Sequence, residues 1–147
     1  MRVIVLDYKN ANKIINHFVA YGFKSFIVFT KDNNTVDSDY YRLNNIEVFN
    51  VNAFLTESTR DKLLKIKGSL IGRFFIVFSS GITDFSLDEI VLNHLLSQKT
   101  VTLIQSKNKL CSALAEQELF DYIDTSKNFE LDTLTRIGED NELMLYN

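Results

Sequence analysis

Residues 74–84 read Phe-Phe-Ile-Val-Phe-Ser-Ser-Gly-Ile-Thr-Asp, an apolar run that stops abruptly at a small polar turn. Five consecutive apolar residues before turn residues predict a buried strand at Phe74–Phe78. In an open α/β sheet, ligands bind beyond the carboxyl ends of the strands, so the turn at Ser79, Ser80 and Gly81 is a candidate ligand site. A phosphate-handling enzyme that uses a metal would place a carboxylate on this turn. The stretch therefore predicts the scaffold of an enzyme with much of its active site missing.

The residues before this stretch predict two further strands that are joined by a helix. Arg2–Leu6 and Ser25–Phe29 are rich in β-branched and aromatic side chains, as expected for buried strands. Between them, apolar residues recur at helical spacing from Ile14 to Val19, and Gly22 is placed to end that helix. A strand, a helix and a second strand within about thirty residues indicate a βαβ unit with a parallel strand pair.

The rest of the chain continues this alternation of strands and helices. Ser86 and Glu89 have the spacing of a capping box, which predicts the start of a helix. In chain order, the other predicted elements are a polar irregular connection at Lys31–Asn45, a strand at Ile46–Val51, a helix at 58–68, a strand at Thr100–Ile104, a helix at Ala113–Ile123, a short helix closed by Gly138 and a strand at Leu143–Tyr146. No repeat or linker interrupts the pattern, so residues 1–147 are expected to form one α/β domain.

The composition argues against several classes of function. A net charge of −3 with dispersed lysines forms no basic stripe, so no nucleic-acid partner is expected. The lone Cys111 allows no intrachain disulfide and is typical of a reducing compartment such as the cytoplasm. No apolar run approaches the ~18 residues of a membrane-spanning helix, and the first residues turn polar too soon for a signal peptide. We therefore expect a cytoplasmic protein with no membrane partner.

Two aspartates near predicted strand ends are candidate ligands for a metal. Asp7 follows the first strand, and Asp84 lies just beyond the strand at Phe74–Phe78. Two carboxylates at one edge of a sheet could hold Mg²⁺. The alternative is that Asp7 is a solvated strand-end charge and Asp84 a turn or helix-cap residue. The candidate ligand site, to which we assign no metal, consists of Asp7, Ser79, Ser80, Gly81 and Asp84.

Other signs of catalysis are weak. The residues from Asp7 to Asn12 read Asp-Tyr-Lys-Asn-Ala-Asn, so no glycine-rich phosphate loop follows the first strand. No Gly-x-Ser-x-Gly elbow surrounds the serines of the turn, and neither His17 nor His94 has a sequence context that makes it their base. We therefore assign no catalytic residue.

The order of three segments resembles that of the sugar-1-phosphate nucleotidyltransferases, most closely the glucose-1-phosphate cytidylyltransferase branch. Asn12–Phe29 is similar to the first helix and second strand of that family. Thr59–Ile104 is similar to the stretch that contains its metal-binding strand, the following helix and the next strand. Glu118–Tyr146, with Phe-Asp-Tyr-Ile-Asp at 120–124, resembles the family's late helix–helix–strand segment.

The chain departs from this family at the positions that carry its chemistry. The family's glycine-rich signature, which ends in basic residues, is replaced here by Asp7–Ala11. The metal-binding aspartate before the glycine of the fourth-strand turn is replaced by Ser80. The sugar-binding middle section is largely missing between Gln105 and Leu119, and the second metal-binding aspartate would lie beyond Tyr146. Because nucleotidyl transfer depends on stabilising negative charge with metal and basic groups, these departures imply the loss of most of that stabilisation.

The resemblance implies a three-layer α/β/α sandwich with a mostly parallel sheet, a trimmed nucleotide-diphospho-sugar transferase-like fold. The leading hypothesis is a degenerate, non-catalytic domain without a cofactor, with a binding or assembly role in sugar-nucleotide or surface-polysaccharide metabolism. Its candidate partners are a second copy, an active homologue, and a nucleotide or sugar phosphate. The rival hypothesis is an active nucleotidyltransferase that joins a nucleoside triphosphate to a sugar-1-phosphate, with Mg²⁺ held by Asp7 and Asp84. A small-ligand sensor without turnover is a third alternative.

Overall fold

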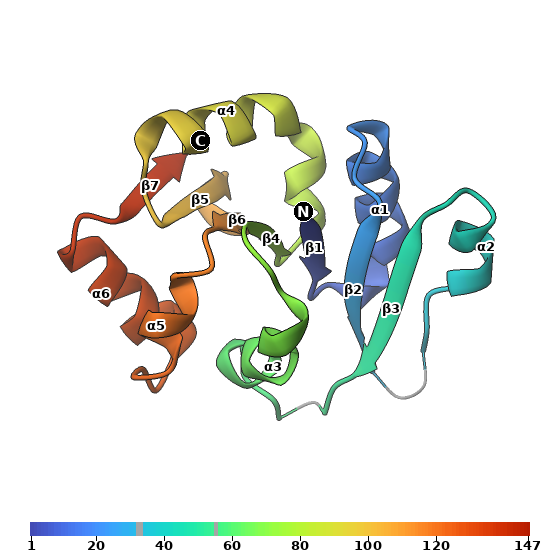
Figure 1. The fold of residues 1–147 in the computed structure, drawn as a ribbon, viewed down its shortest axis with the longest axis horizontal. Coiled ribbons are helices and arrows are strands. Elements are labelled where there is room, and N and C mark those ends of the chain that lie inside the picture. Colours follow the sequence, from blue (N-terminus) through green and yellow to red (C-terminus); the bar gives the residue numbers. More distant parts are fainter. Residues whose placement is uncertain (32–33, 55) are drawn as a thin grey trace.

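The centre of the computed structural model, which describes residues 1–31, 34–54 and 56–147, is a seven-stranded sheet (Figure 1). The strand order is β3-β2-β1-β4-β6-β5-β7. The strands are β1 Arg2–Val5, β2 Ser25–Thr30, β3 Glu47–Asn52, β4 Phe74–Val77, β5 Val101–Ser106, β6 Lys109–Ala115 and β7 Leu143–Tyr146. Only β6 runs antiparallel to its neighbours, β4 and β5, and the other described pairs are parallel. The predicted mostly parallel sheet is therefore confirmed.

Helices cover both faces of this sheet (Figure 1). The α-helices are α1 Ala11–Ala20, α2 Ser38–Arg42, α3 Thr59–Ile66, α4 Leu87–Ser97, α5 Leu119–Ile123 and α6 Leu134–Glu139. The other helical turns are η1 Tyr8–Asn10, η2 Lys67–Ser69, η3 Ser80–Asp84 and η4 Phe129–Thr133. Side chains of α1, α2 and α4 pack into one buried cluster, whereas those of α3, α5 and α6 pack into another. The predicted three-layer arrangement is confirmed. Within the described residues, no helix combines the length and apolarity needed to cross a membrane.

The central strands are apolar throughout because both of their faces are covered. Val3 and Val5 of β1 face the layer that contains α1, and Ile4 faces the layer that contains α3. All three are fully buried. Parallel strands that are covered on both faces read as continuous apolar runs, which is why these segments were recognisable from the sequence.

Local signals set the ends of the longer helices. The hydroxyl of Ser86 accepts a hydrogen bond from the backbone N–H of Glu89 (3.4 Å), which confirms the predicted start of α4. The carboxylate of Glu89 accepts a hydrogen bond from Tyr146 Oη (3.2 Å) and so ties α4 to β7. Gly22 follows α1 with a φ of 90°, a conformation that glycine adopts without steric cost.

Three predictions about individual elements need correction. Residues up to Ala115 belong to β6, so the helix predicted at Ala113–Ile123 is confined to α5. The connection at Lys31–Asn45 contains α2, and Asp32 and Asn33 of that connection lie outside the described residues. Gly138 lies inside α6, and the chain turns instead at Asn141, whose φ is 57°.

Candidate functional site

The carboxyl ends of β1 and β4 meet at the point where the strand order reverses. From β1 the chain adds β2 and β3 on one side, and it then returns to place β4 on the other side. Val5 is in register with Val77, and the N–H of Leu6 donates to the carbonyl of Val77 (2.9 Å). Asp7 and Ser79, which follow these strands, are therefore brought to the same edge of the sheet. Such a reversal is the usual place for a ligand in an open α/β sheet.

Asp7 closes its own turn at this edge. Its carboxylate accepts a hydrogen bond from Asn10 Nδ2 (2.8 Å), and its carbonyl accepts one from the N–H of Asn10 (3.3 Å). The chain passes through η1 directly into α1, so side chains stand where a glycine-rich loop would leave backbone amides open to a phosphate.

The turn after β4 is packed against β6. The N–H groups of Phe78 and Ser79 both donate to the carbonyl of Cys111 (2.9 and 3.2 Å), and Ser79 Oγ accepts from the N–H of Gly81 (3.4 Å). A Cβ atom on Gly81 would lie 3.1 Å from Cys111 Cβ, so this close approach favours glycine. The carbonyl of Ser80 accepts a bond from Thr83 Oγ1 (2.8 Å). Hydrogen bonds to β6 and within the turn thus fix the backbone of this turn.

Asp84 is exposed at the end of η3, five residues beyond Ser79. In residues 1–31, 34–54 and 56–147, no three His, Cys, Asp or Glu side chains lie close enough together to hold a metal ion. Asp7 is engaged by Asn10, and the turn itself carries serine rather than a carboxylate. The described residues thus offer no carboxylate on the turn itself, and we derive no step through Mg²⁺.

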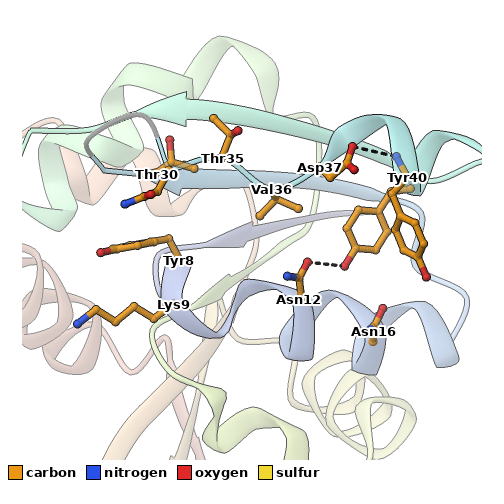
Figure 2. A pocket seen from close by; sticks show the side chains of 11 residues that line it. Tyr8, Lys9, Asn12, Asn16, Thr30, Thr35, Val36, Asp37 and Tyr40 are labelled. Atoms are coloured by element: carbon orange, nitrogen blue, oxygen red, sulfur yellow. Dashed lines mark hydrogen bonds between the residues drawn. The ribbon is translucent and has the colours of Figure 1, made fainter.

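A polar hollow of about 810 Å³ lies beside the carboxyl ends of β1 and β2 (Figure 2). Its walls come from η1 and α1, from the segment that follows β2, and from α2. The lining residues are Tyr8, Lys9, Asn12, Asn16, Thr30, Asn34, Thr35, Val36, Asp37, Tyr40 and Tyr41. The volume lies within the range of pockets that take small organic ligands.

Hydrogen bonds between the walls hold this hollow in shape. Tyr41 Oη donates to Asn12 Oδ1 (2.8 Å), which joins α2 to α1. The side chain of Asn50 on β3 pairs with both backbone groups of Val36 (2.9 and 3.0 Å). The Asp37 carboxylate caps α2 by accepting from the N–H groups of its first turn. Burial, with a smaller effect of the neighbouring Tyr40, raises the pKa of Tyr41, so its hydroxyl remains a donor at neutral pH.

A second hollow of about 230 Å³ adjoins the first and shares Tyr8 and Thr30 with it. Lys31 and Lys62 line this second hollow, and Lys9 lines the first. In Figure 2, Tyr8 and Lys9 project side by side from η1. An aromatic face beside an ammonium group suits a ligand that combines a planar ring with an anionic group.

The contact between Tyr41 and Asn12 gives a direct test of how the larger hollow is held. Tyr41→Phe is expected to lower the free energy of unfolding by about 1 kcal/mol, because it removes one hydrogen bond while Asn12, which is exposed, regains water. Urea denaturation would measure the change. Tyr40→Phe is the matched control, since Tyr40 is 60% exposed and its loss of a hydroxyl should change stability by less than about 0.5 kcal/mol. Equal effects of the two substitutions would contradict this account of the wall.

Sequence reasoning drew attention to the carboxyl edge of the sheet but missed most of the hollow. The predicted site residues Asp7, Ser79, Ser80, Gly81 and Asp84 all follow β1 or β4, and their role as a ligand site stays a prediction. Sequence reasoning passed over the polar residues of α1 and α2. One available signal was Asp37 before Ser38–Arg42, which is a typical N-cap position.

Comparisons with known proteins show a similarity of fold alone. No family model and no curated protein matches the sequence. Each of the following matches covers 99% of this chain. A Bacillus anthracis protein described as a glucose-1-phosphate thymidylyltransferase, solved with sucrose, has a TM-score of 0.68 at 9% identity, and 85% of that protein is covered. A Desulfovibrio desulfuricans protein described as a nucleotide-diphospho-sugar transferase has a TM-score of 0.55 at 12% identity, with 79% of it covered. A 4-diphosphocytidyl-2C-methyl-D-erythritol synthase has a TM-score of 0.60 at 10% identity, with 88% of it covered. The chain therefore has a nucleotidyltransferase-like fold, as its resemblance to the sugar-1-phosphate nucleotidyltransferases predicts.

Proposed function

We propose that this chain is a non-catalytic nucleotidyltransferase-like domain that binds a nucleotide or a sugar phosphate at the carboxyl edge of its sheet. Its role would be binding or assembly within sugar-nucleotide or surface-polysaccharide metabolism. The observation that carries the proposal is the contrast between two parts of this edge. The hollows beside β1 and β2 are open and are lined by lysine side chains, whereas the Asp7 carboxylate and the turn after β4 form hydrogen bonds within the chain.

The open part of the edge supports ligand binding. Lys9 forms no ion pair with any of the described residues, so its charge is available to an anionic ligand. Tyr8 stands between the two hollows, where its ring can pack against a planar group. Charge-assisted hydrogen bonds from ammonium groups to phosphate are among the stronger polar contacts in proteins.

The engaged part of the edge argues against nucleotidyl transfer. That reaction develops negative charge on the transferred phosphoryl group, and its catalysis depends on cations and donors aimed at this charge. Here the backbone after β1 goes straight into η1. In the turn after β4, the N–H of Gly81 donates to Ser79 Oγ and the hydroxyl of Thr83 donates to the carbonyl of Ser80, so neither donor is aimed at a ligand. A ligand can therefore be held at this edge without a preorganised site for the chemical step.

Calorimetric titration with CTP, UTP and glucose-1-phosphate in the presence of Mg²⁺, together with an assay of pyrophosphate release, tests the proposal. We expect saturable binding of at least one compound and no pyrophosphate. Lys9→Ala should weaken that binding about fivefold, the equivalent of about 1 kcal/mol from one charge-assisted contact. Lys107→Ala is the matched control, because Lys107 lies in the turn between β5 and β6 and lines neither hollow.

Two outcomes would contradict the proposal in different ways. Pyrophosphate release that disappears in Asp84→Ala would establish the rival hypothesis of an active enzyme. If none of the three compounds binds, the ligand-binding role is refuted, and assembly is the only proposed role that remains.

A further inference from the structure

Two aromatic side chains from different elements line the smaller hollow at the carboxyl edge of the sheet. Tyr8 belongs to η1, and Phe54 follows the end of β3. Phe54 is 71% exposed, so most of its side chain is open to solvent. A single exposed aromatic residue needs no explanation by itself, but this one stands at a hollow that a second aromatic residue also lines.

Hydrogen bonds hold the backbone of Phe54 in place. Its N–H donates to Glu57 Oε1 (3.1 Å), and its carbonyl accepts from the N–H of Glu57 (3.0 Å). Lys65 Nζ donates to the same carboxylate oxygen (2.8 Å). The hydrogen bonds from Lys65 and from the Phe54 backbone lower the pKa of Glu57, so this carboxylate is ionised at neutral pH. A ligand that packs against the exposed ring therefore has to order only a side chain, which reduces the entropic cost of binding.

The smaller hollow suits one ring of a larger ligand. Its volume of about 230 Å³ is below the roughly 300 Å³ from which pockets take a whole small molecule. Besides the two aromatic residues, its apolar lining consists of Leu6, Phe29 and Ala53. The hollow adjoins the larger one at Tyr8 and Thr30, and the lining there is mainly amide and hydroxyl groups. The two hollows thus differ in character, one largely apolar and the other polar.

This division matches the two parts of a nucleotide. A base is planar and presents an apolar face to aromatic rings, and stacking of this kind accepts any base because every base has a π face. Lys31 and Lys62, which also line the smaller hollow, can donate to acceptor atoms at the edge of a base. The pentose has hydroxyl groups for the polar hollow, and the phosphate has negative charge for Lys9. A sugar phosphate has no ring to place against Phe54.

We propose that the smaller hollow receives the base of a nucleotide against the rings of Tyr8 and Phe54, so that the chain selects nucleotides over sugar phosphates. The inference rests on the proposed ligand-binding function and narrows its ligand class. The base lies beside the ends of β2 and β3 rather than at the turn after β4, and the sugar and phosphate extend past Tyr8 into the larger hollow. Phe54 is then a binding residue that determines specificity.

Calorimetric titration of the full chain with matched compounds tests this selection. CMP and AMP each carry a base that ribose-5-phosphate lacks, and glucose-1-phosphate is a second sugar phosphate. We expect the tighter-binding nucleotide of the two to bind about tenfold more tightly than either sugar phosphate. NMR signals of its base protons should shift upfield on binding, because these protons enter the shielding region over an aromatic ring.

Substitutions at the two rings separate a contact with the base from a general effect on the site. Phe54→Ala should weaken nucleotide binding about fivefold and leave the binding of ribose-5-phosphate unchanged, since only the base contacts Phe54. Tyr8→Leu should also weaken nucleotide binding, whereas Tyr8→Phe, which keeps the ring, should retain it. Phe49→Ala is the matched control, because Phe49 is 47% exposed on β3 and lines neither hollow. A thermal melt of each variant should confirm that it is folded.

The results that would overturn the inference also separate it from the proposed function. If the sugar phosphates bind as tightly as the nucleotides, or if Phe54→Ala keeps the wild-type affinity for nucleotides, the contact with the base is refuted and the ligand-binding function stands. An equal loss of affinity for nucleotides and sugar phosphates in Phe54→Ala would likewise refute the contact. If none of the four compounds binds, the inference and the ligand-binding function are refuted together.

Discussion

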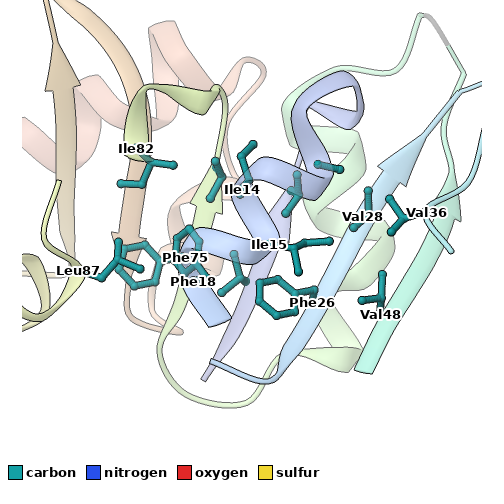
Figure 3. Close-up of a cluster of buried hydrophobic side chains, with 14 of the residues drawn as sticks. Ile14, Ile15, Phe18, Phe26, Val28, Val36, Val48, Phe75, Ile82 and Leu87 are labelled. Carbon is teal, nitrogen blue, oxygen red and sulfur yellow. The ribbon is translucent and has the colours of Figure 1, made fainter. Parts of the chain in front are cut away.

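Replacing Phe75 with alanine is expected to lower the free energy of unfolding by about 3–5 kcal/mol. Phe75 is fully buried on β4, and its ring lies next to that of Phe18 (Figure 3). The ring centroid of Phe75 is 5.1 Å from that of Phe18 and 5.7 Å from that of Phe23, both in edge-to-face geometry. The substitution would remove apolar contact area, leave a cavity between α1 and the sheet, and end both ring contacts. Chemical denaturation followed by circular dichroism measures the change.

Two further variants keep this prediction testable if the alanine variant does not fold. Phe75→Leu retains most of the volume and should cost about 1–2 kcal/mol. Phe54→Ala is the matched control, because Phe54 is 71% exposed and its loss should change stability by less than about 0.5 kcal/mol. A loss of under 1 kcal/mol in Phe75→Ala would contradict the view that this aromatic cluster anchors the layer.

Arg73→Met is expected to lower the free energy of unfolding by about 2 kcal/mol near neutral pH, since it removes charge-assisted hydrogen bonds from a largely covered ion pair. Arg73 donates from Nε and Nη2 to the two oxygens of Glu116 (2.8 and 2.7 Å). Glu116 Oε2 also lies 3.5 Å from Nε2 of His94. His94 is buried, and its Nδ1 lies 2.7 Å from Thr102 Oγ1.

The same substitution should change the pH dependence of stability. Burial lowers the pKa of His94 below its ordinary value of 6.5, Glu116 opposes this shift, and Arg73 reinforces it. A group whose pKa is lower in the folded state binds its proton more readily after unfolding. Wild-type stability should therefore fall as the pH decreases from about 6.5 through the lowered pKa of His94. Without Arg73, burial is opposed by Glu116 with no neighbouring cation, so the pKa of His94 rises and the loss of stability on acidification becomes smaller.

Denaturation curves between pH 5 and 8 would measure this effect, and NMR titration of the His94 ring would report its pKa directly. His94→Gln, which retains a polar side chain beside Thr102, should remove the contribution of this group to the pH dependence. A steeper acid loss of stability in Arg73→Met than in the wild type would refute the assignment.

The sequence was sufficient to predict most of the sheet because its strands are marked by composition. β1, β2 and β4 read as continuous apolar runs, and serine caps mark the starts of α3 and α4. β6 was not predictable in this way. Its residues Ala113, Leu114 and Ala115 favour helices, and they become a strand by pairing with β5 in a hairpin and with β4, which is distant in the sequence.

The candidate site was predictable only in its location. Asp7 and Ser79 follow the ends of two parallel strands, β1 and β4, and parallel strands end at the same edge of a sheet. A βαβ pattern in the sequence is enough to predict this edge. The hollow depends instead on how α2 and the segment before it pack on α1 and β3, through contacts such as Tyr41 with Asn12 and Val36 with Asn50. These contacts join residues that are 14 to 29 positions apart, and no local pattern in the sequence signals them.

The position of β1 in the middle of the sheet has a consequence for synthesis on the ribosome. β2 can pair with β1 once residue 28 has emerged, but the partner for the other edge, β4, is complete only at residue 77. Throughout this interval the nascent chain exposes an apolar strand edge, which is a template for pairing with other chains. Translation between these two residues is accordingly a stage at which the protein is prone to aggregate.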